Sequence, residues 1–367
     1  MPASPIRRLV KYAEEARARG IKVYTLNIGQ PDIPTPEVAF ETLRNIDRKV
    51  LEYSPSEGLR SLRVKLQQYY KRFNIDVDVD DIIVTTGGSE AVLFAFMACL
   101  DPGDEIIVPE PAYANYMAFA ISAGAKIVTV PSTIDDGFQL PPVEKFKALI
   151  TERTKGILIC NPNNPTGRLI PLPLLEQILQ YCAAQGARLF LDECFLDLTE
   201  DGVSAKSLLA AHPELLILKA FTKSYGMAGI RLGYCLCADN ALLRRMAAAS
   251  PPWNVSTPAQ SAGVAALAER DFLQRTLSLV RTERRWLTDN LTALGFWVCP
   301  SHANYLLFRG PLGLREGLLQ QGIAIRGCGN YNGLGDGWYR IAVRPHGENE
   351  ALITATRQFC KEKALWQ

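Results

Sequence analysis

Short apolar runs alternate with helix-forming segments along the middle of the chain, and this alternation constrains the fold more than any other feature. The apolar runs predict strands at 82–84, 105–108, 126–130, 156–160, 188–191, 215–220 and 231–237. Between them, a wider apolar spacing predicts helices at 91–100, 113–122, 172–185 and 241–249. Strands that alternate with helices form a mostly parallel sheet covered on both faces. The expected fold is therefore α/β, with a three-layer α/β/α large domain whose functional residues gather at strand ends.

The pattern changes after residue 253. A helix at 259–267 precedes a long charged-apolar helix at 271–294, which is long enough to bridge two domains. Short strands at 304–308, 323–326 and 338–343, with helices at 313–320 and 348–360, predict a small α+β domain. Because 367 residues exceed one simple core, we expect a large domain at 50–268 and a small domain made of 1–49 and 269–367.

The composition argues against several classes of protein. Forty basic residues against 38 acidic ones give a net charge of +2 without a basic stripe, so we expect no nucleic-acid partner. No apolar run reaches membrane-spanning length and the first residues lack a signal-peptide core, so we expect a cytoplasmic protein without a membrane partner. The nine cysteines have no spacing that suits zinc, which predicts core thiols in a reducing compartment and no metal site.

Lys223 is predicted to lie on a short glycine-containing turn between two core strands. An amine in that position is partly desolvated, which lowers its pKa and makes it nucleophilic. Arg231 follows eight residues later and suits a phosphate. A lysine that forms a Schiff base beside a phosphate-binding arginine indicates pyridoxal 5'-phosphate (PLP) as a cofactor. The alternative is an ordinary surface loop with two solvated cations.

Two other predicted strand ends carry polar side chains that suit this cofactor. Asp192 ends the strand at 188–191, and a carboxylate buried there needs a partner such as a pyridinium N–H. The alternative is that Asp192 caps a helix or forms an ion pair. Asn164 lies in the run 161–167, whose prolines exclude a helix or a central strand. This places Asn164 at the rim of the sheet, where it can donate a hydrogen bond.

Glycine-rich and aromatic segments add three more candidates. The turn Gly87-Gly88-Ser89 opens a helix and presents backbone N–H groups to an anion. Tyr113 follows two prolines and can lay its ring on a flat cofactor, although half-buried packing is the alternative. Gly29 lies in an extended segment and lets a substrate approach the backbone, although a simple turn is the alternative.

In their order and spacing, these elements resemble the fold-type I PLP enzymes, in the class I/II aminotransferase group, over nearly the whole chain. The residues that carry the resemblance are 29–32, Tyr53, 87–89, Tyr113, 161–167, 192–193, 222–223 and Arg231. The resemblance implies an aspartate aminotransferase-like fold in which the large domain binds PLP.

The resemblance also implies roles for individual residues. Lys223 matches the Schiff-base lysine that shuttles protons, and Asp192 matches the aspartate that pairs with the pyridinium nitrogen. Asn164 matches the asparagine that bonds the ring hydroxyl beside the substrate, and Tyr113 matches the aromatic residue that stacks on the ring. The residues that match the phosphate-binding cup are Gly87, Gly88, Ser89, Thr222 and Arg231.

Three further residues match positions that face the substrate or a second subunit. Tyr53 matches a tyrosine given to the neighbouring subunit's phosphate, which implies a homodimer. Arg340 matches the arginine that takes the substrate carboxylate, and Gly29 matches a glycine next to the substrate. The intact Lys223 and Arg340 argue against a non-catalytic protein of this fold, such as the effector domain of a regulator.

Two departures from the family pattern bear on the reaction. Up to about Asn164 the chain resembles bacterial aspartate-type aminotransferases. Beyond Asn164 the chain resembles histidinol-phosphate aminotransferase and threonine-phosphate decarboxylase. Phe195 stands where aminotransferases of this group usually have a tyrosine that bonds the ring oxygen. We expect amino transfer from an amino acid or phosphorylated amino compound to a 2-oxo acid. The alternative is decarboxylation of a phosphorylated amino acid.

Arg326 ends a predicted strand, and Arg340 lies on the next one. Both are expected to face one cleft, and a second arginine there suggests a second anion on the substrate. In histidinol-phosphate aminotransferase and the decarboxylase, an arginine at this position meets the substrate phosphate. The alternative is that Arg326 pairs only with a structural carboxylate.

Overall fold

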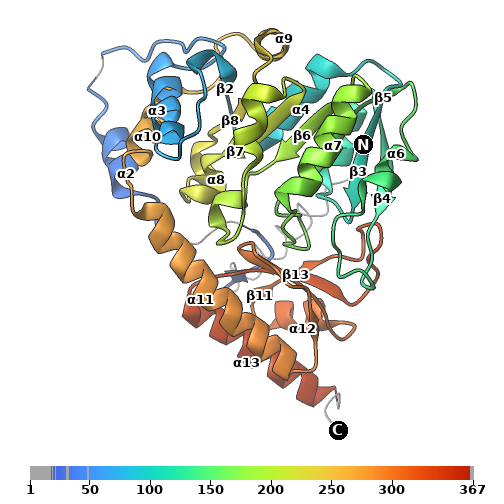
Figure 1. Cartoon of the computed structure of the whole chain (residues 1–367). Helices are drawn as coiled ribbons and strands as arrows, with labels where there is room; N and C mark the ends of the chain where they lie inside the picture. Colours follow the sequence, from blue (N-terminus) through green and yellow to red (C-terminus); the bar gives the residue numbers. More distant parts are fainter. Residues whose placement is uncertain (1–17, 19, 21, 30–32, 48, 364–367) are drawn as a thin grey trace.

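Seven strands form the large sheet of the computed structural model, which describes residues 18, 20, 22–29, 33–47 and 49–363 (Figure 1). In sheet order the strands are β2 (Ile82–Thr85), β8 (Gly233–Leu236), β7 (Leu215–Ala220), β6 (Arg188–Asp192), β5 (Thr154–Cys160), β3 (Glu105–Glu110) and β4 (Lys126–Pro131). Only β8 runs antiparallel to its neighbours. The central parallel strands therefore all end at the same edge of the sheet.

Alternate side chains of the central strands enter two separate cores. Leu158, Phe190 and Leu218 pack with one set of helices, whereas Ile159 and Ile217 pack with the other. The first set is α4 (Gly88–Cys99), α5 (Asn115–Ser122) and α9 (Asn240–Ala249). The second set is α3 (Arg60–Lys71), α6 (Val143–Lys147), α7 (Leu172–Ala184) and α10 (Thr257–Ala266). Burial on both faces explains why these strands are continuous apolar runs.

A four-stranded antiparallel sheet forms the smaller part of the molecule. Its strands, in order, are β12 (Arg326–Gly327), β13 (Trp338–Ala342), β10 (Tyr305–Arg309) and β9 (Trp297–Val298). Its helices are α11 (Phe272–Ala293), α12 (Leu314–Gln320) and α13 (His346–Glu362). The long helix α11 runs from the large part of the molecule into the small part (Figure 1). The remaining short helices are α8 (Phe221–Ser224) and the 3-10 helices η1 (Val79–Asp81), η2 (Leu196–Leu198), η3 (Ala205–Ala211) and η4 (Ala228–Ile230).

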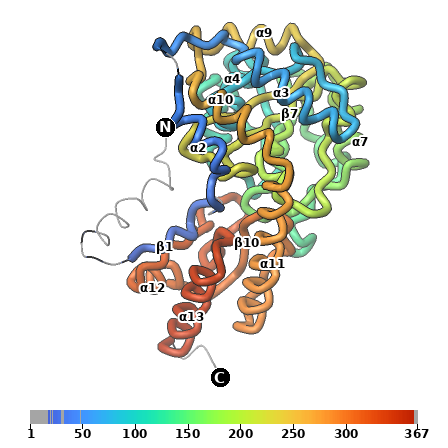
Figure 2. The backbone as a smooth tube through the Cα atoms, turned by 90° about the vertical axis from the view of Figure 1, so that its left-hand side faces the viewer, coloured from blue at the N-terminus to red at the C-terminus, as the bar shows by residue number. Residues whose placement is uncertain are grey.

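The N-terminal segment contributes to both parts of the molecule. Strand β1 (Tyr24–Thr25) pairs in parallel with β11 (Ile323–Ala324), and Leu26 lies in the core of the small part. Helix α2 (Glu37–Arg44) packs on the large part, where Ala39 is buried (Figure 2). The domain boundaries at 50 and 268 stay a prediction. The sequence also predicts a short helix at 6–19, which lies mostly outside the described residues.

The predicted architecture, a mostly parallel sheet with helices plus a small second sheet, is confirmed. Two local details differ. The strand expected from 231 begins at Gly233, because Arg231 adopts a left-handed conformation with φ 60°. The strand expected at 323–326 is divided between two sheets on either side of Ile325. Within the described ranges, no helix is both long and apolar enough to cross a membrane.

Candidate active site

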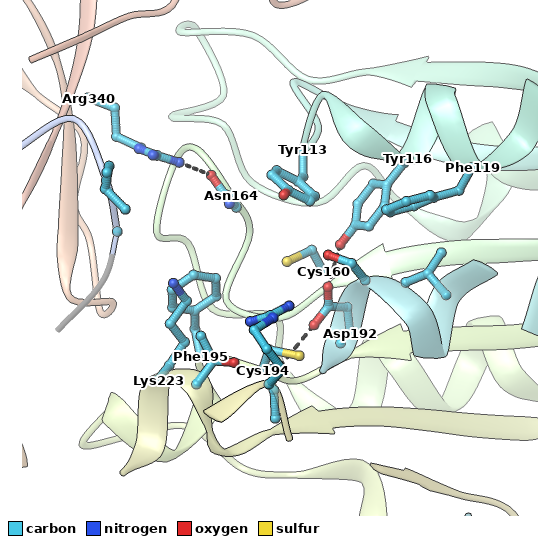
Figure 3. Close-up of a pocket in the computed structure, with 18 of the residues that line it drawn as sticks. Tyr113, Tyr116, Phe119, Cys160, Asn164, Asp192, Cys194, Phe195, Lys223 and Arg340 are labelled. Carbon is cyan, nitrogen blue, oxygen red and sulfur yellow. Dashed lines mark hydrogen bonds between the residues drawn. The ribbon is translucent and has the colours of Figure 1, made fainter. Parts of the chain in front are cut away.

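A cavity of about 260 Å³ lies where β5, β6 and β7 end, facing the small part of the molecule (Figure 3). The sequence-predicted residues that line it are Gly29, Gly88, Ser89, Tyr113, Asn164, Asp192, Thr222, Lys223, Arg231 and Arg340. Gly87 lies directly beside the lining, against Arg231. Tyr53 and Arg326 do not line the cavity. Residues from seven separate segments thus meet at one edge of the sheet. Residues 30–32, which follow Gly29 in its motif, lie outside the described residues.

Lys223 lies on α8, which begins immediately after β7. The sequence suggested a simple turn there, whereas the structure forms one helical turn. Its Nζ lies 5.2 Å from the centre of the Phe195 ring. Burial, followed by the nearby guanidinium groups of Arg340 and Arg231, lowers the pKa of Lys223 to about 8. A substantial fraction of this amine is therefore uncharged, and nucleophilic, near that pH.

Asp192 ends β6 with both carboxylate oxygens partnered. Its Oδ1 accepts a hydrogen bond from the Cys194 amide at 3.0 Å, and its Oδ2 accepts one from the Tyr116 hydroxyl at 2.7 Å. Tyr116 was not among the sequence candidates, although it lies in the first turn of α5, three residues after Tyr113. The two tyrosine rings meet edge to face, with centroids 5.4 Å apart. Asp192 is therefore held in a fixed orientation at the cavity wall (Figure 3).

The first residues of α4 and Arg231 form a cradle for an anion. Gly87 has φ 103°, and a Cβ added to it would lie 2.9 Å from Nη2 of Arg231. A Cβ on Gly88 would lie 2.7 Å from the Cys194 sulfur. The glycines therefore let the guanidinium and the free N–H groups of a twelve-residue helix approach one another. Ser89 and Thr222 add hydroxyl groups to the same cavity wall.

Arg340 enters the cavity from β13. Its Nη1 donates to Oδ1 of Asn164 at 2.6 Å, and its Nη2 donates to the carbonyl of Asn27 at 3.2 Å. The guanidinium lies 5.5 Å from the centre of the Tyr305 ring. Arg340 is 6% exposed, and its Nε has no hydrogen-bond partner among the described residues. The structure thus brings the two predicted substrate-facing groups, Asn164 and Arg340, into direct contact.

Arg326 lies directly opposite Arg340 in the antiparallel pairing of β12 with β13. Residues paired in this way project from the same face of a sheet. Arg326 is 4% exposed, its Nη2 donates to Asn330 at 2.9 Å, and its guanidinium lies 5.6 Å from the Tyr331 ring centre. Within the described part of the chain it forms no ion pair, and its Nε has no partner. The structural carboxylate considered as an alternative is therefore absent from those residues.

Two aromatic residues bear on the remaining predictions. Tyr53 is 77% exposed and stacks on Trp253 at 4.8 Å, away from the cavity of its own chain. Phe195 lines the cavity and packs edge-on against Tyr305, with ring centres 5.1 Å apart. Because a phenyl ring has no hydroxyl, this part of the wall offers no hydrogen bond.

Known proteins share both the sequence pattern and the fold. The family model described as aminotransferase class I and II matches residues 21–357. A histidinol-phosphate aminotransferase of Methanosarcina mazei is 32% identical, over 82% of this chain and 78% of that protein. A threonine-phosphate decarboxylase of Salmonella typhimurium is 34% identical, over 75% of this chain and 76% of that protein. A solved structure of an aspartate aminotransferase double mutant from Thermus thermophilus superimposes with a TM-score of 0.88 at 30% identity, covering 98% of this chain and 97% of that one.

Proposed function

The chain belongs to the aminotransferase class I and II family and is a PLP-dependent aminotransferase, and we propose that its amino donor is dianionic or phosphorylated. The observation that carries this proposal is the pair of buried arginines, Arg326 and Arg340, on one face of the small sheet. Both are held by amides, carbonyls and aromatic rings, and the described residues supply neither with a carboxylate.

Two like charges buried side by side are costly unless an anion joins them. A planar guanidinium binds a carboxylate or a phosphate with two parallel hydrogen bonds. A phosphate monoester carries nearly two negative charges at neutral pH, and so would supply the second anion, at Arg326, while Arg340 holds the carboxylate. The names of two relatives, histidinol-phosphate aminotransferase and threonine-phosphate decarboxylase, each contain a phosphorylated amine and support the same donor class.

The cavity suits the cofactor of the family. We assign the phosphate to the cradle where glycine backbone lies against Arg231 and to the hydroxyl groups of Ser89 and Thr222. Asp192, fixed by Tyr116, would face the pyridine nitrogen, and Tyr113 would lie on the ring. Bound PLP withdraws electrons from the substrate carbon that carries the amine.

The chain's own residues then direct the reaction. Lys223 would hold the cofactor covalently through its amine, and that amine, when uncharged, would accept a proton from the substrate carbon. Its pKa of about 8 suits this role, because the amine gains and loses protons near neutral pH. Arg340 holds the donor carboxylate, and Asn164 fixes the orientation of Arg340. The amino group leaves the donor and passes in a second half-reaction to a 2-oxo acid.

We further propose a homodimer in which Tyr53 reaches the phosphate site of the neighbouring subunit. Its exposure and its stacking on Trp253 support a role outside its own cavity. Mixing inactive Lys223→Ala with inactive Tyr53→Ala should restore part of the activity, since one heterodimer site is intact. A fully active monomer in sedimentation would contradict the assignment.

A reducing, cytoplasmic compartment also stays a proposal. It is supported by the nine cysteines, all of which have free thiols. Eight of them are buried, as expected for small core residues. Unchanged melting of the purified protein with and without a thiol reductant would agree with this proposal, and a large loss of stability on reduction would contradict it.

Matched donor pairs test the substrate proposal. Purified protein with PLP and 2-oxoglutarate is given threonine phosphate or threonine, and histidinol phosphate or histidinol, and the products are identified by mass. We expect kcat/KM to be at least about 30-fold higher for a phosphorylated member, since one added charge-assisted contact contributes about 2 kcal/mol. Equal values in every pair would contradict the proposal.

Decarboxylation is the second candidate, because Phe195 offers the cavity no hydroxyl at the position where aminotransferases of this group usually have a tyrosine. The same reactions distinguish it. Release of carbon dioxide from threonine phosphate without any 2-oxo acid would overturn amino transfer as the main reaction. Formation of glutamate in proportion to the oxo product would support amino transfer.

A further inference from the structure

A set of four ionisable side chains lies behind the active site, on the face of the large sheet that α3 and α10 cover. Lys219, Glu193 and Lys206 are buried, and Asp197 is half-buried. Two cations and two anions make the set neutral overall. None of these residues lines the cavity, and the catalytic roles described above use none of them.

Hydrogen bonds connect this set to both catalytic strand ends. Lys219 donates to Oδ1 of Asp197 at 2.7 Å and to the backbone carbonyl of Glu193 at 3.3 Å. The other oxygen of Asp197 accepts from the Ser224 hydroxyl at 2.8 Å. Glu193 directly follows Asp192, and Ser224 directly follows Lys223. One continuous chain of contacts therefore links the backbone beside Asp192 to the backbone beside Lys223.

The ion pair in this chain is charged at neutral pH. Burial opposes a charge on Lys219, but Asp197 and Glu193 raise its pKa above the ordinary lysine value. Burial likewise raises the pKa of Asp197, but Lys219 and Lys206 lower it below the ordinary range. The contact is thus a charge-assisted bond that resists a change in length.

We propose that Lys219 and Asp197 are positioning residues that hold α8, and with it the amine of Lys223, at a fixed place relative to Asp192. This inference rests on Lys223 being the lysine that binds the cofactor. A displacement of about 1 Å at a reacting group can lower the rate roughly 100-fold. The groups around Lys223 are Arg340, Cys194, Arg231 and Asp192, and a shift of α8 would change its distance to each of them.

The alternative is that the set stabilises the core without affecting the geometry of Lys223. Lys206 provides a matched control, because it is a buried cation of the same set. Its amine lies over the ring of Tyr70, 4.7 Å from the centre, and among the described residues it donates no hydrogen bond to α8 or to the segment 193–197. A purely structural role predicts the same consequences for Lys219→Met and Lys206→Met. A positioning role predicts that only Lys219→Met alters Lys223.

The experiment follows the visible absorption of the cofactor-loaded protein against pH, together with kcat and the melting temperature. Loss of Lys219 leaves Asp197 unpaired and frees α8, and both effects raise the pKa of Lys223. We expect the titration midpoint of Lys219→Met to rise by about one pH unit and kcat to fall roughly 100-fold. Lys219→Arg should have nearly the wild-type midpoint and kcat, because arginine keeps the positive charge and the hydrogen-bond donors.

Ser224→Ala removes one hydrogen bond without changing any charge. A shift of the titration midpoint in this variant therefore reports a change in the position of Lys223 alone. We expect a rise in the midpoint that is smaller than in Lys219→Met, with little change in melting temperature. Lys206→Met should lower the melting temperature and leave the midpoint unchanged. If Lys219→Met does not fold, Ser224→Ala decides the question.

Two results would overturn the inference. The first is a titration midpoint that stays at the wild-type value in both Ser224→Ala and Lys219→Met. The second is a midpoint that moves as far in Lys206→Met as in Lys219→Met. A failure of the underlying assignment is distinguishable, because the wild-type protein itself would then show no absorption band linked to Lys223.

Discussion

Two groups of buried cations in this molecule have opposite surroundings. Behind the large sheet, Lys219 and Lys206 lie among Asp197 and Glu193, and the group is neutral. In the small sheet, Arg326 and Arg340 lie opposite each other, and within the described residues no carboxylate pairs with either. The first group has its anions within the chain, whereas the described residues supply none to the second.

We interpret the first group as one that stabilises the fold and holds α8, and the second as one that binds a ligand. Removing one member of a paired set leaves an uncompensated charge, which is strongly destabilising. Removing one of two unpaired like charges relieves repulsion and desolvation instead. The paired group should therefore be sensitive in unfolding experiments, and the arginine pair should be sensitive in substrate binding.

The largest effect is expected for Arg340→Met. Loss of two charge-assisted hydrogen bonds, each worth about 2 kcal/mol, should lower kcat/KM for the preferred donor roughly 1,000-fold. The matched control is Arg309→Met, which removes an exposed arginine from the neighbouring strand β10. Steady-state kinetics with both variants measures the contrast, and equal losses would remove Arg340 from the substrate site.

Asp197→Asn should have the largest effect on stability. It leaves Lys219 buried without its carboxylate, which should lower the free energy of unfolding by roughly 3 kcal/mol. Since the folded-state pKa of Asp197 is depressed, its stabilisation is present at neutral pH and is lost as the pH falls through that folded-state pKa. Denaturant unfolding of wild type and variant at neutral and acidic pH measures both statements. A difference that persists unchanged at acidic pH would argue against the ion pair.

Arg326→Met should affect binding without harming the fold. We expect the preference for a phosphorylated donor over its unphosphorylated counterpart to fall about 30-fold. The unphosphorylated donor serves as the internal control, because its kcat/KM should change little. The melting temperature of the free protein should stay the same or rise. A melting temperature lowered as far as in Asp197→Asn would show that Arg326 has a structural anion after all.

The smallest effect concerns Lys223 in the cofactor-free protein. Because its folded-state pKa of about 8 is below the ordinary lysine value, the unfolded chain binds more protons between these two values. Its charge thus costs stability below pH 8, and the cost disappears as the pH rises toward the ordinary value. Lys223→Met should therefore melt slightly higher than wild type at pH 7, with the difference shrinking above pH 8. A lower melting temperature at pH 7 would contradict the desolvated environment of the amine.

The sequence was sufficient to predict the large sheet and most of the cavity wall. Buried strands are continuous apolar runs, and the carboxyl ends of parallel strands meet at one edge, so Lys223, Asp192 and Asn164 could be placed together. The glycines beside Arg231 could be recognised because a glycine-rich turn that opens a helix presents backbone N–H groups to an anion.

Contacts between distant segments could not be predicted in this way. Tyr116 reaches Asp192 from a helix 76 residues earlier, and no local pattern indicates that bond. Lys219 lies within an apolar run and has no sequence feature that reveals its partner Asp197. The alignment of Arg326 with Arg340 depends on strand register, which the short strands alone do not specify. The site proposed for Tyr53 belongs to a second subunit, whose position the sequence of one chain does not give.

The roles proposed for both groups of cations depend on Lys223 being the lysine that binds the cofactor. Locating the cofactor on the chain therefore tests the account most directly. The PLP-loaded protein is treated with borohydride, which fixes the cofactor onto its lysine, and is then digested and mapped by mass. We expect the added mass on the peptide that contains Lys223 and on no other. A label on Lys219, Lys206 or any other lysine would contradict the account.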